Sequence, residues 1–123
     1  MEIHESAEDY LETILMLTER IGNVRSVDIS NEMGFKKSSV SVAMKNLRNT
    51  GHIVVDENGY IKLTVLGKEV ADMIYERHKF FSSWLMKLGV NKETALEDAC
   101  RIEHVISKES FAAIKSFLNS YNN

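Results

Sequence analysis

Apolar residues recur at helical spacing over most of the chain, and the first run lies within residues 6–21. Its apolar members are Tyr10, Leu11, Ile14, Leu15 and Leu17. Their three- and four-residue spacing predicts an amphipathic helix. The stretch Ser6–Asp9 has the form of a capping box, which we expect to open this helix, and Gly22 follows its end.

Two shorter apolar runs follow on either side of Gly34. The first is expected to begin at Ser26, a good N-cap residue, and to stop at Gly34. The second is expected to start near Ser38 and to end at Gly51. Two short helices joined by a tight turn predict a helix-turn-helix.

The spacing changes between His52 and Thr64, where two short β-rich runs flank Asn58-Gly59. Asn-Gly is a strong hairpin signal because both residues tolerate the positive φ of a type I′ turn. A helix-turn-helix followed by a β-hairpin is the arrangement called a winged helix.

Helical spacing returns after the hairpin. We expect one long helix over residues 65–88, a second capped by Asn91 and a third capped by Ser107. The predicted fold is mainly α, with an N-terminal winged helix-turn-helix and its small β-hairpin wing in residues 1–70. A C-terminal helical dimerisation domain follows in residues 71–123. These helices carry more apolar surface than one small core needs, which favours a homodimer.

Composition narrows the class of protein. Hydrophobic residues make up 44% of the chain, which is typical of a globular protein. No apolar run approaches the ~18 residues that a membrane helix needs, and the N-terminal MEIHESAEDY lacks the features of a secretory signal. A single cysteine makes no internal disulfide, so we expect a cytoplasmic protein without a membrane partner.

Charge is distributed unevenly along the chain. No Asp or Glu occurs between Gly34 and Val55, a segment of net charge +4, whereas the whole chain carries −3. Such a local basic patch binds phosphates even on an acidic protein, because the field near a surface follows nearby charges. Taken alone, the patch fits a solvated helix face better. Together with the helix pair and the hairpin, it favours double-stranded operator DNA as a partner.

The second helix of a helix-turn-helix enters the major groove with its N-terminal residues on base edges. Here Val42 could touch a thymine methyl, whereas Lys45 and Arg48 are better placed for phosphates. Lys62 on the wing could contact the backbone too. The candidate DNA-binding residues are Lys36, Lys37, Ser38, Ser39, Ser41, Val42, Lys45, Arg48 and Lys62. The alternative is a three-helix core with a polar outer face.

The stretch DACRIEHVIS, residues 98–107, places three metal donors on one helix. At 100° per residue, Cys100, Glu103 and His104 share an arc of roughly 100° with Leu96 and Ala99. A buried carboxylate and imidazole are costly unless something pairs them, and one divalent cation would satisfy all three donors.

Each of these donors also has an ordinary interpretation. A lone cytosolic cysteine is usually a small buried hydrophobe. Glu103 could pair with Arg101 or Lys108 at the surface, and His104 could be a satisfied core histidine. The helix by itself leaves both interpretations open.

Three further donors lie elsewhere in the sequence. Asp9 and Glu12 stand at i and i+3, on one face of the first helix. Asp9 could simply complete the capping box, and Glu12 could be solvated. His78 precedes an apolar pair in the long helix and could be an exposed helix histidine.

The chain resembles the diphtheria-toxin-repressor family of metal-dependent transcriptional repressors, which has iron-dependent and manganese-dependent branches. SAEDYLETI looks like the family's first helix, and YERHKF and DACRIEHVIS look like its metal-binding segments. The resemblance implies a homodimer with two DNA-binding lobes around a helical core. It also implies that metal bound between the first helix and the core helices permits operator binding.

Carried over by position, the manganese branch implies metal donors at Asp9, Glu12, His78, Glu103 and His104. Its sixth donor is a glutamate where this chain has Cys100. The iron branch has cysteine there, but methionine where this chain has Asp9. Carboxylates and imidazoles suit Mn²⁺ or Fe²⁺, whereas a thiolate draws the site toward Fe²⁺, Co²⁺ or Zn²⁺. We expect Mn²⁺ or Fe²⁺ as the cofactor, with Zn²⁺ or Co²⁺ also binding in vitro.

The leading hypothesis is a transcriptional repressor, not an enzyme, that senses Mn²⁺ or Fe²⁺ and controls metal uptake. A second hypothesis is a winged-helix regulator that senses oxidants through Cys100 without a metal. A third is a Cys-dependent enzyme in which His104 activates the thiolate. The sequence offers that enzyme no recognisable third orienting group or oxyanion site.

Overall fold

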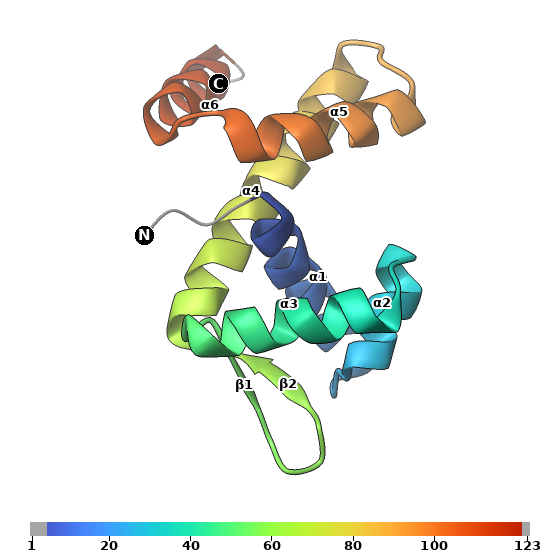
Figure 1. The fold of residues 1–123 in the computed structure, drawn as a ribbon. Coiled ribbons are helices and arrows are strands. Elements are labelled where there is room, and N and C mark those ends of the chain that lie inside the picture. Colours follow the sequence, from blue (N-terminus) through green and yellow to red (C-terminus); the bar gives the residue numbers. More distant parts are fainter. Residues whose placement is uncertain (1–4, 122–123) are drawn as a thin grey trace. The chain divides into compact units, whose positions relative to one another are not determined.

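The computed structural model describes residues 5–121, and the chain divides into two compact units between Tyr75 and Glu76 (Figure 1). The first unit contains α1 (Glu5–Ile21), α2 (Ser26–Met33), α3 (Lys37–Asn49), β1 (Ile53–Val55) and β2 (Ile61–Leu63). Helix α4 (Val65–Lys87) runs through the division, and α5 (Lys92–Val105) and α6 (Lys108–Tyr121) belong to the second unit. The mainly α fold with a two-stranded hairpin confirms the predicted fold class.

The core of the first unit forms where the apolar sides of its elements meet. Leu11 and Ile14 of α1, Val40 of α3 and Ile53 of β1 are almost completely buried. Ala71 of α4 joins the same cluster. The helical spacing read from the sequence therefore identified the inward sides of α1 and α3 correctly.

Helices α2 and α3 and the turn between them form a helix-turn-helix, as predicted. Gly34 has a φ of 70° and donates its N–H to the Ser30 carbonyl at 2.9 Å. This left-handed conformation suits glycine, which has no Cβ to clash. The Ser30 hydroxyl donates to the Phe35 carbonyl at 2.6 Å, which ties the turn back to α2.

Two helix starts differ from the prediction. Helix α1 already includes Glu5, so Ser6 lies inside its first turn instead of at the N-cap. In α2 the N-cap position is Arg25, not Ser26, and the Asp28 carboxylate accepts the Arg25 backbone N–H at 2.9 Å. An acidic side chain in the first turn meets the exposed N–H groups there, so a serine cap is not needed.

The wing is a β-hairpin, but its turn is not the predicted type I′. Gly59 has a φ of 81°, whereas no residue other than glycine has a positive φ in residues 5–121. The Asp56 N–H donates to the Tyr60 carbonyl at 3.0 Å, leaving a three-residue loop. The Asp56 carboxylate accepts the N–H groups of Asn58 and Tyr60 at 2.9 and 3.0 Å. This side chain favours a type I turn followed by a left-handed glycine.

Helix α4 starts in close contact with the base of the wing. A Cβ added to Gly67 would lie 1.9 Å from the backbone oxygen of His52. The same oxygen accepts the Thr64 N–H at 3.1 Å, and the Thr64 hydroxyl accepts the Gly67 N–H at 3.1 Å. Only glycine allows α4 and the wing to approach this closely.

The second unit has a small aromatic core built by three helices. Phe81 of α4, Ala99 of α5 and Phe111 of α6 are its buried members. The Phe80 and Phe111 rings meet edge to face, with centroids 5.4 Å apart. The expected caps are confirmed: the Asn91 side chain accepts the Glu93 N–H at 2.9 Å, and Ser107 accepts the Ser110 N–H at 3.0 Å. Within residues 5–121, no helix is long and apolar enough to cross a membrane.

Candidate metal centre and nucleic-acid interface

The buried side of α5 is a line of small residues that ends in a carboxylate. Ala95, Ala99 and Glu103, spaced four residues apart, each have an exposed fraction of 0%. Leu96, which the helical spacing predicts to lie on the same inward arc, is 36% exposed. The arc is rotated because α5 packs with Ala99 against the aromatic residues of α4 and α6.

Glu103 is the buried centre of a cluster of candidate metal donors in the second unit. Its Oε2 lies 3.1 Å from Nδ1 of His78, and its Oε1 lies 3.4 Å from Nε2 of His104. Among the described residues, Oε1 makes no hydrogen bond of acceptable geometry. Removing a carboxylate from water is costly unless charge or hydrogen bonds compensate it. Both oxygens therefore fit a site that takes a cation.

The ordinary interpretations of three of these residues are wrong. Glu103 is fully buried, so it does not pair with Arg101 or Lys108 at the surface. His78 is not a solvated helix histidine, because its ring contacts Glu103 and its side chain is only 23% exposed. Cys100 is exposed instead of being a small buried hydrophobe.

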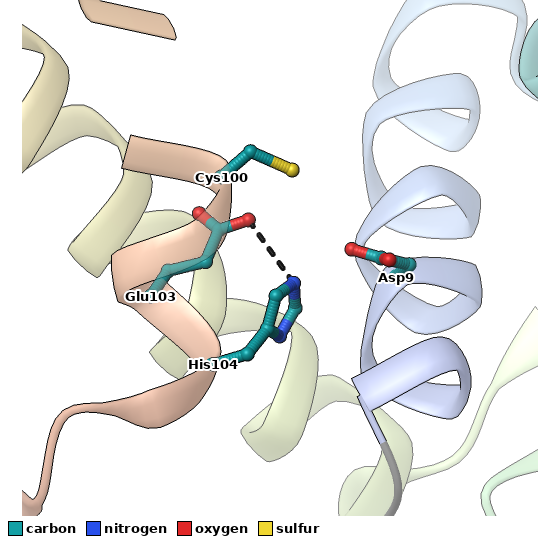
Figure 2. A group of neighbouring side chains, drawn as sticks. All are labelled: Asp9, Cys100, Glu103 and His104. Atoms are coloured by element: carbon teal, nitrogen blue, oxygen red, sulfur yellow. Dashed lines mark ion pairs between the residues drawn. The ribbon is translucent and has the colours of Figure 1, made fainter. Parts of the chain in front are cut away.

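The three donors of α5 lie on one side of the helix. One ligand atom from each of Cys100, Glu103 and His104 lies within 4.8 Å of the others. Figure 2 shows these side chains on α5, with the ion pair between Glu103 and His104 drawn as a dashed line. Sulfur, carboxylate oxygen and imidazole nitrogen in such a group form a donor set that suits first-row transition metals.

The two remaining candidate donors belong to the first unit. Asp9 and Glu12 lie one turn apart on α1, and the Glu12 side chain is buried. Figure 2 also shows the Asp9 carboxylate projecting from α1. The Asp9 backbone carbonyl accepts the Thr13 hydroxyl at 2.8 Å, an ordinary helical side-chain bond.

Arg77 is a buried residue of the second unit that no sequence pattern indicated as a site residue. Its Nη1 donates to the backbone carbonyls of Glu103 at 3.0 Å and Ile106 at 2.8 Å. The guanidinium also lies over the Phe111 ring, 5.5 Å from its centroid. A side chain that bonds to backbone 26 residues away leaves no local sequence signal. The only hint is a charged residue between the apolar positions of α4.

The candidate DNA-binding residues line the outer side of α3. Val40, Met44 and Leu47 are buried, so the opposite side of the helix faces solvent. All nine candidates are exposed: Lys36, Lys37, Ser38, Ser39, Ser41, Val42, Lys45, Arg48 and, on β2, Lys62. Helix α3 contains no acidic residue in its first turn and has Arg48 in its last. The surface is therefore basic, polar and accessible.

Comparison with known proteins identifies the family. The N-terminal DNA-binding domain of the iron-dependent repressors matches residues 2–62, and their metal-binding and dimerisation domain matches residues 64–123. The chain belongs to the iron-dependent repressor family. This confirms the resemblance drawn from the first helix and from the segments YERHKF and DACRIEHVIS.

Individual transcriptional regulators match the chain at moderate identity. The transcriptional regulator MntR of Escherichia coli O6:H1 is 32% identical over 117 residues, which are 95% of this chain and 76% of that protein. The HTH-type regulator MJ0568 of Methanocaldococcus jannaschii is 32% identical over 119 residues, which are 95% of each. The structure of the manganese regulator SloR is similar with a TM-score of 0.81 and 28% identity. The matched region covers 97% of this chain and 55% of SloR, so this chain spans just over half the length of SloR.

The family membership favours one of the three sequence-based hypotheses. Iron-dependent repressors combine a DNA-binding domain with a metal-binding and dimerisation domain. The relatives are transcriptional regulators, a class defined by DNA binding and not by catalysis. A metal-dependent repressor is therefore favoured over an oxidant sensor without metal and over a Cys-dependent enzyme.

Proposed function

We propose that this protein is a homodimeric repressor that binds operator DNA when Mn²⁺ or Fe²⁺ is bound, and that it controls metal uptake. The observation that carries the proposal is the buried Glu103 carboxylate, which lies beside His78 and His104. Packing alone would favour an apolar side chain at this buried position. A buried carboxylate needs a compensating charge, which a divalent cation would supply.

The metal site is proposed to hold one ion through Asp9, Cys100, Glu103 and His104. Glu12 and His78 would support a second, weaker ion. Support for the two α1 carboxylates comes from their residue types, their spacing on one face of α1 and the family resemblance. The bound ion would supply a fixed positive charge that joins α1 to α5. Metal would then select one arrangement of the DNA-binding unit from a broader ensemble.

The DNA-binding surface is proposed to be α3 with the wing. The small serines at 38, 39 and 41 would let the helix sit close to base edges, with Val42 against a thymine methyl. Lys45, Arg48 and Lys62 would contact phosphates. A second copy of the chain would provide the other half of a two-fold symmetric DNA site. Phe117, 67% exposed on α6, is one of the apolar side chains available for the interface between copies.

The test is DNA binding with and without metal. Binding sites are first selected from random double-stranded DNA in the presence of Mn²⁺, and affinity is then measured with Mn²⁺, Fe²⁺, Co²⁺, Zn²⁺ or a chelator. We expect tight binding only with metal. Equal affinity in the presence of the chelator would show that the protein does not sense a metal.

A matched pair of variants on α5 locates the sensor. His104→Ala should abolish metal-dependent DNA binding while the dimer stays folded, because a donor next to Glu103 is lost. Arg101→Ala changes an exposed residue of the same helix and should leave the response intact. A normal metal response of His104→Ala would return His104 to the role of a core histidine.

Cys100 is proposed to decide the preference among metals. A thiolate favours Fe²⁺, Co²⁺ or Zn²⁺ relative to a carboxylate, which suits Mn²⁺. Cys100→Glu should therefore raise the affinity for Mn²⁺ relative to Co²⁺. Alkylation of the exposed thiol with and without Mn²⁺ tests ligation directly, since a coordinated sulfur is protected. Cys100→Ser that kept the metal response but lost a response to peroxide would support the oxidant sensor instead.

A further inference from the structure

Two consecutive residues of α4 contact Glu103, one at its side-chain carboxylate and one at its backbone carbonyl. His78 contacts the carboxylate, with Nδ1 at 3.1 Å from Oε2. Arg77 contacts the backbone, with Nη1 at 3.0 Å from the Glu103 carbonyl oxygen. The position of the central carboxylate is therefore set from two directions by the same turn of α4.

The Arg77 bonds fall at the place where α5 ends. Helix α5 ends at Val105, so the carbonyls of its last turn have no partner within the helix. Arg77 donates a hydrogen bond to the Glu103 carbonyl and another, at 2.8 Å, to the carbonyl of Ile106, the first residue after the helix. Its charge is favourable there because the C-terminal end of a helix is partially negative. The last turn of α5, which carries Glu103 and His104, is thereby fixed to α4.

The Arg77 guanidinium is itself held in place. Arg77 as a whole residue is 5% exposed, and its guanidinium lies over the Phe111 ring of α6. On the same ring, Lys115 lies 5.8 Å from the centroid and forms an exposed ion pair with Glu76 at 2.9 Å. A buried guanidinium pre-organised by an aromatic ring loses little freedom when it bonds to two carbonyls.

We propose that Arg77 is a positioning residue of the metal site, which holds the last turn of α5 so that Glu103 and His104 meet the ion together. It touches neither the ion nor DNA. This inference rests on the proposed metal binding and deepens it. The loss of Arg77 would leave every donor present but free the turn that carries two of them, and such supporting contacts commonly contribute about 10–100-fold to metal affinity.

The experiment uses the full chain and Co²⁺ as the probe. Co²⁺ affinity is measured by chelator competition, and its visible spectrum reports the geometry around the ion. Arg77→Met should lower the affinity about tenfold or more and alter the spectrum. Arg77→Lys restores a cation with N–H donors and should recover part of the affinity. Lys115→Met, the control, removes the other cation from the same ring without touching α5 and should bind as the wild type does.

The outcomes separate the two proposals. A wild-type chain that binds no Co²⁺ refutes the metal site itself. If the wild type binds Co²⁺ and a folded Arg77→Met binds it equally with the same spectrum, only the role of Arg77 is refuted. Equal losses in Arg77→Met and Lys115→Met would also refute it, because they would indicate general loosening around Phe111. If Arg77→Met does not fold, Arg77→Gln decides by the same criteria, since it removes the charge but keeps one donor.

Discussion

Gly67 provides a sharp test of how the wing is joined to the long helix. Its replacement by alanine would normally help, because alanine is favoured over glycine in a helix interior by about 1 kcal/mol. Here the added Cβ would meet the His52 backbone oxygen at 1.9 Å, and real Cβ atoms essentially never approach closer than 3.0 Å. The chain must therefore move by roughly 1 Å at this contact.

The displaced oxygen is not free to move without loss. It accepts the Thr64 N–H at 3.1 Å, the bond that closes the base of the wing. Overpacking costs about 1–3 kcal/mol, and a strained or lost hydrogen bond costs about 0.5–1.5 kcal/mol more. After subtraction of the helix gain, we expect Gly67→Ala to destabilise the first unit by about 1–3 kcal/mol.

Urea denaturation followed by circular dichroism measures this change, and DNA affinity measures its functional effect. Glu69→Ala is the control, because Glu69 is an exposed residue that follows shortly after Gly67 in the same helix. Surface changes of that kind stay within about 0.5 kcal/mol. A Gly67→Ala protein with a midpoint equal to or above that of the wild type would show that close approach of the two backbones does not constrain this junction.

Three further changes test the first unit in other ways. Burial lowers the pKa of His52 below its ordinary value of 6.5, so the unfolded chain takes up a proton more readily than the folded one. The free energy of unfolding should reach its full value above pH 6.5 and decrease as the pH falls below it. Thermal melts of His52→Gln should lack this pH-dependent decrease. Arg48→Ala should reduce the slope of log affinity against log salt by about 1 for each copy of the chain, which is about 2 for the dimer. Lys68→Ala, outside the proposed interface, should leave the slope unchanged. Asp56→Ala removes the acceptor for two loop N–H groups, and melts should show a loss of about 1 kcal/mol.

Features that depend on neighbouring residues could be predicted from the sequence. The spacing of apolar residues located every helix, because the side of a helix that packs inward follows from its period. The caps at Asn91 and Ser107 were predicted for the same reason, since a cap joins residues two or three positions apart. The wing turn differed because the Asp56 side chain, outside the Asn-Gly pair, supplies the acceptors that select its type.

Features that depend on packing could not be predicted in this way. The spacing in α5 indicated an apolar arc, but the partners of Ala99 in α4 and α6 determine which residues lie at its centre. The exposure of Leu96 and Cys100 follows from that rotation and not from their own chemistry. The bonds from Arg77 to the end of α5 join segments 26 and 29 residues apart, and only the fold brings them together.

Glu103 is a residue that favours metal binding but lowers the stability of the fold that contains it. It continues a buried line of Ala95 and Ala99, where an apolar side chain would pack without any cost of desolvating a charge. The neighbouring imidazoles lie 3.1 and 3.4 Å from its two oxygens, and Oε1 makes no hydrogen bond of acceptable geometry among the described residues. A divalent cation would compensate the negative charge of both oxygens. Because ligand binding to the folded state stabilises it, the proposed ion would stabilise the second unit at a fully buried carboxylate.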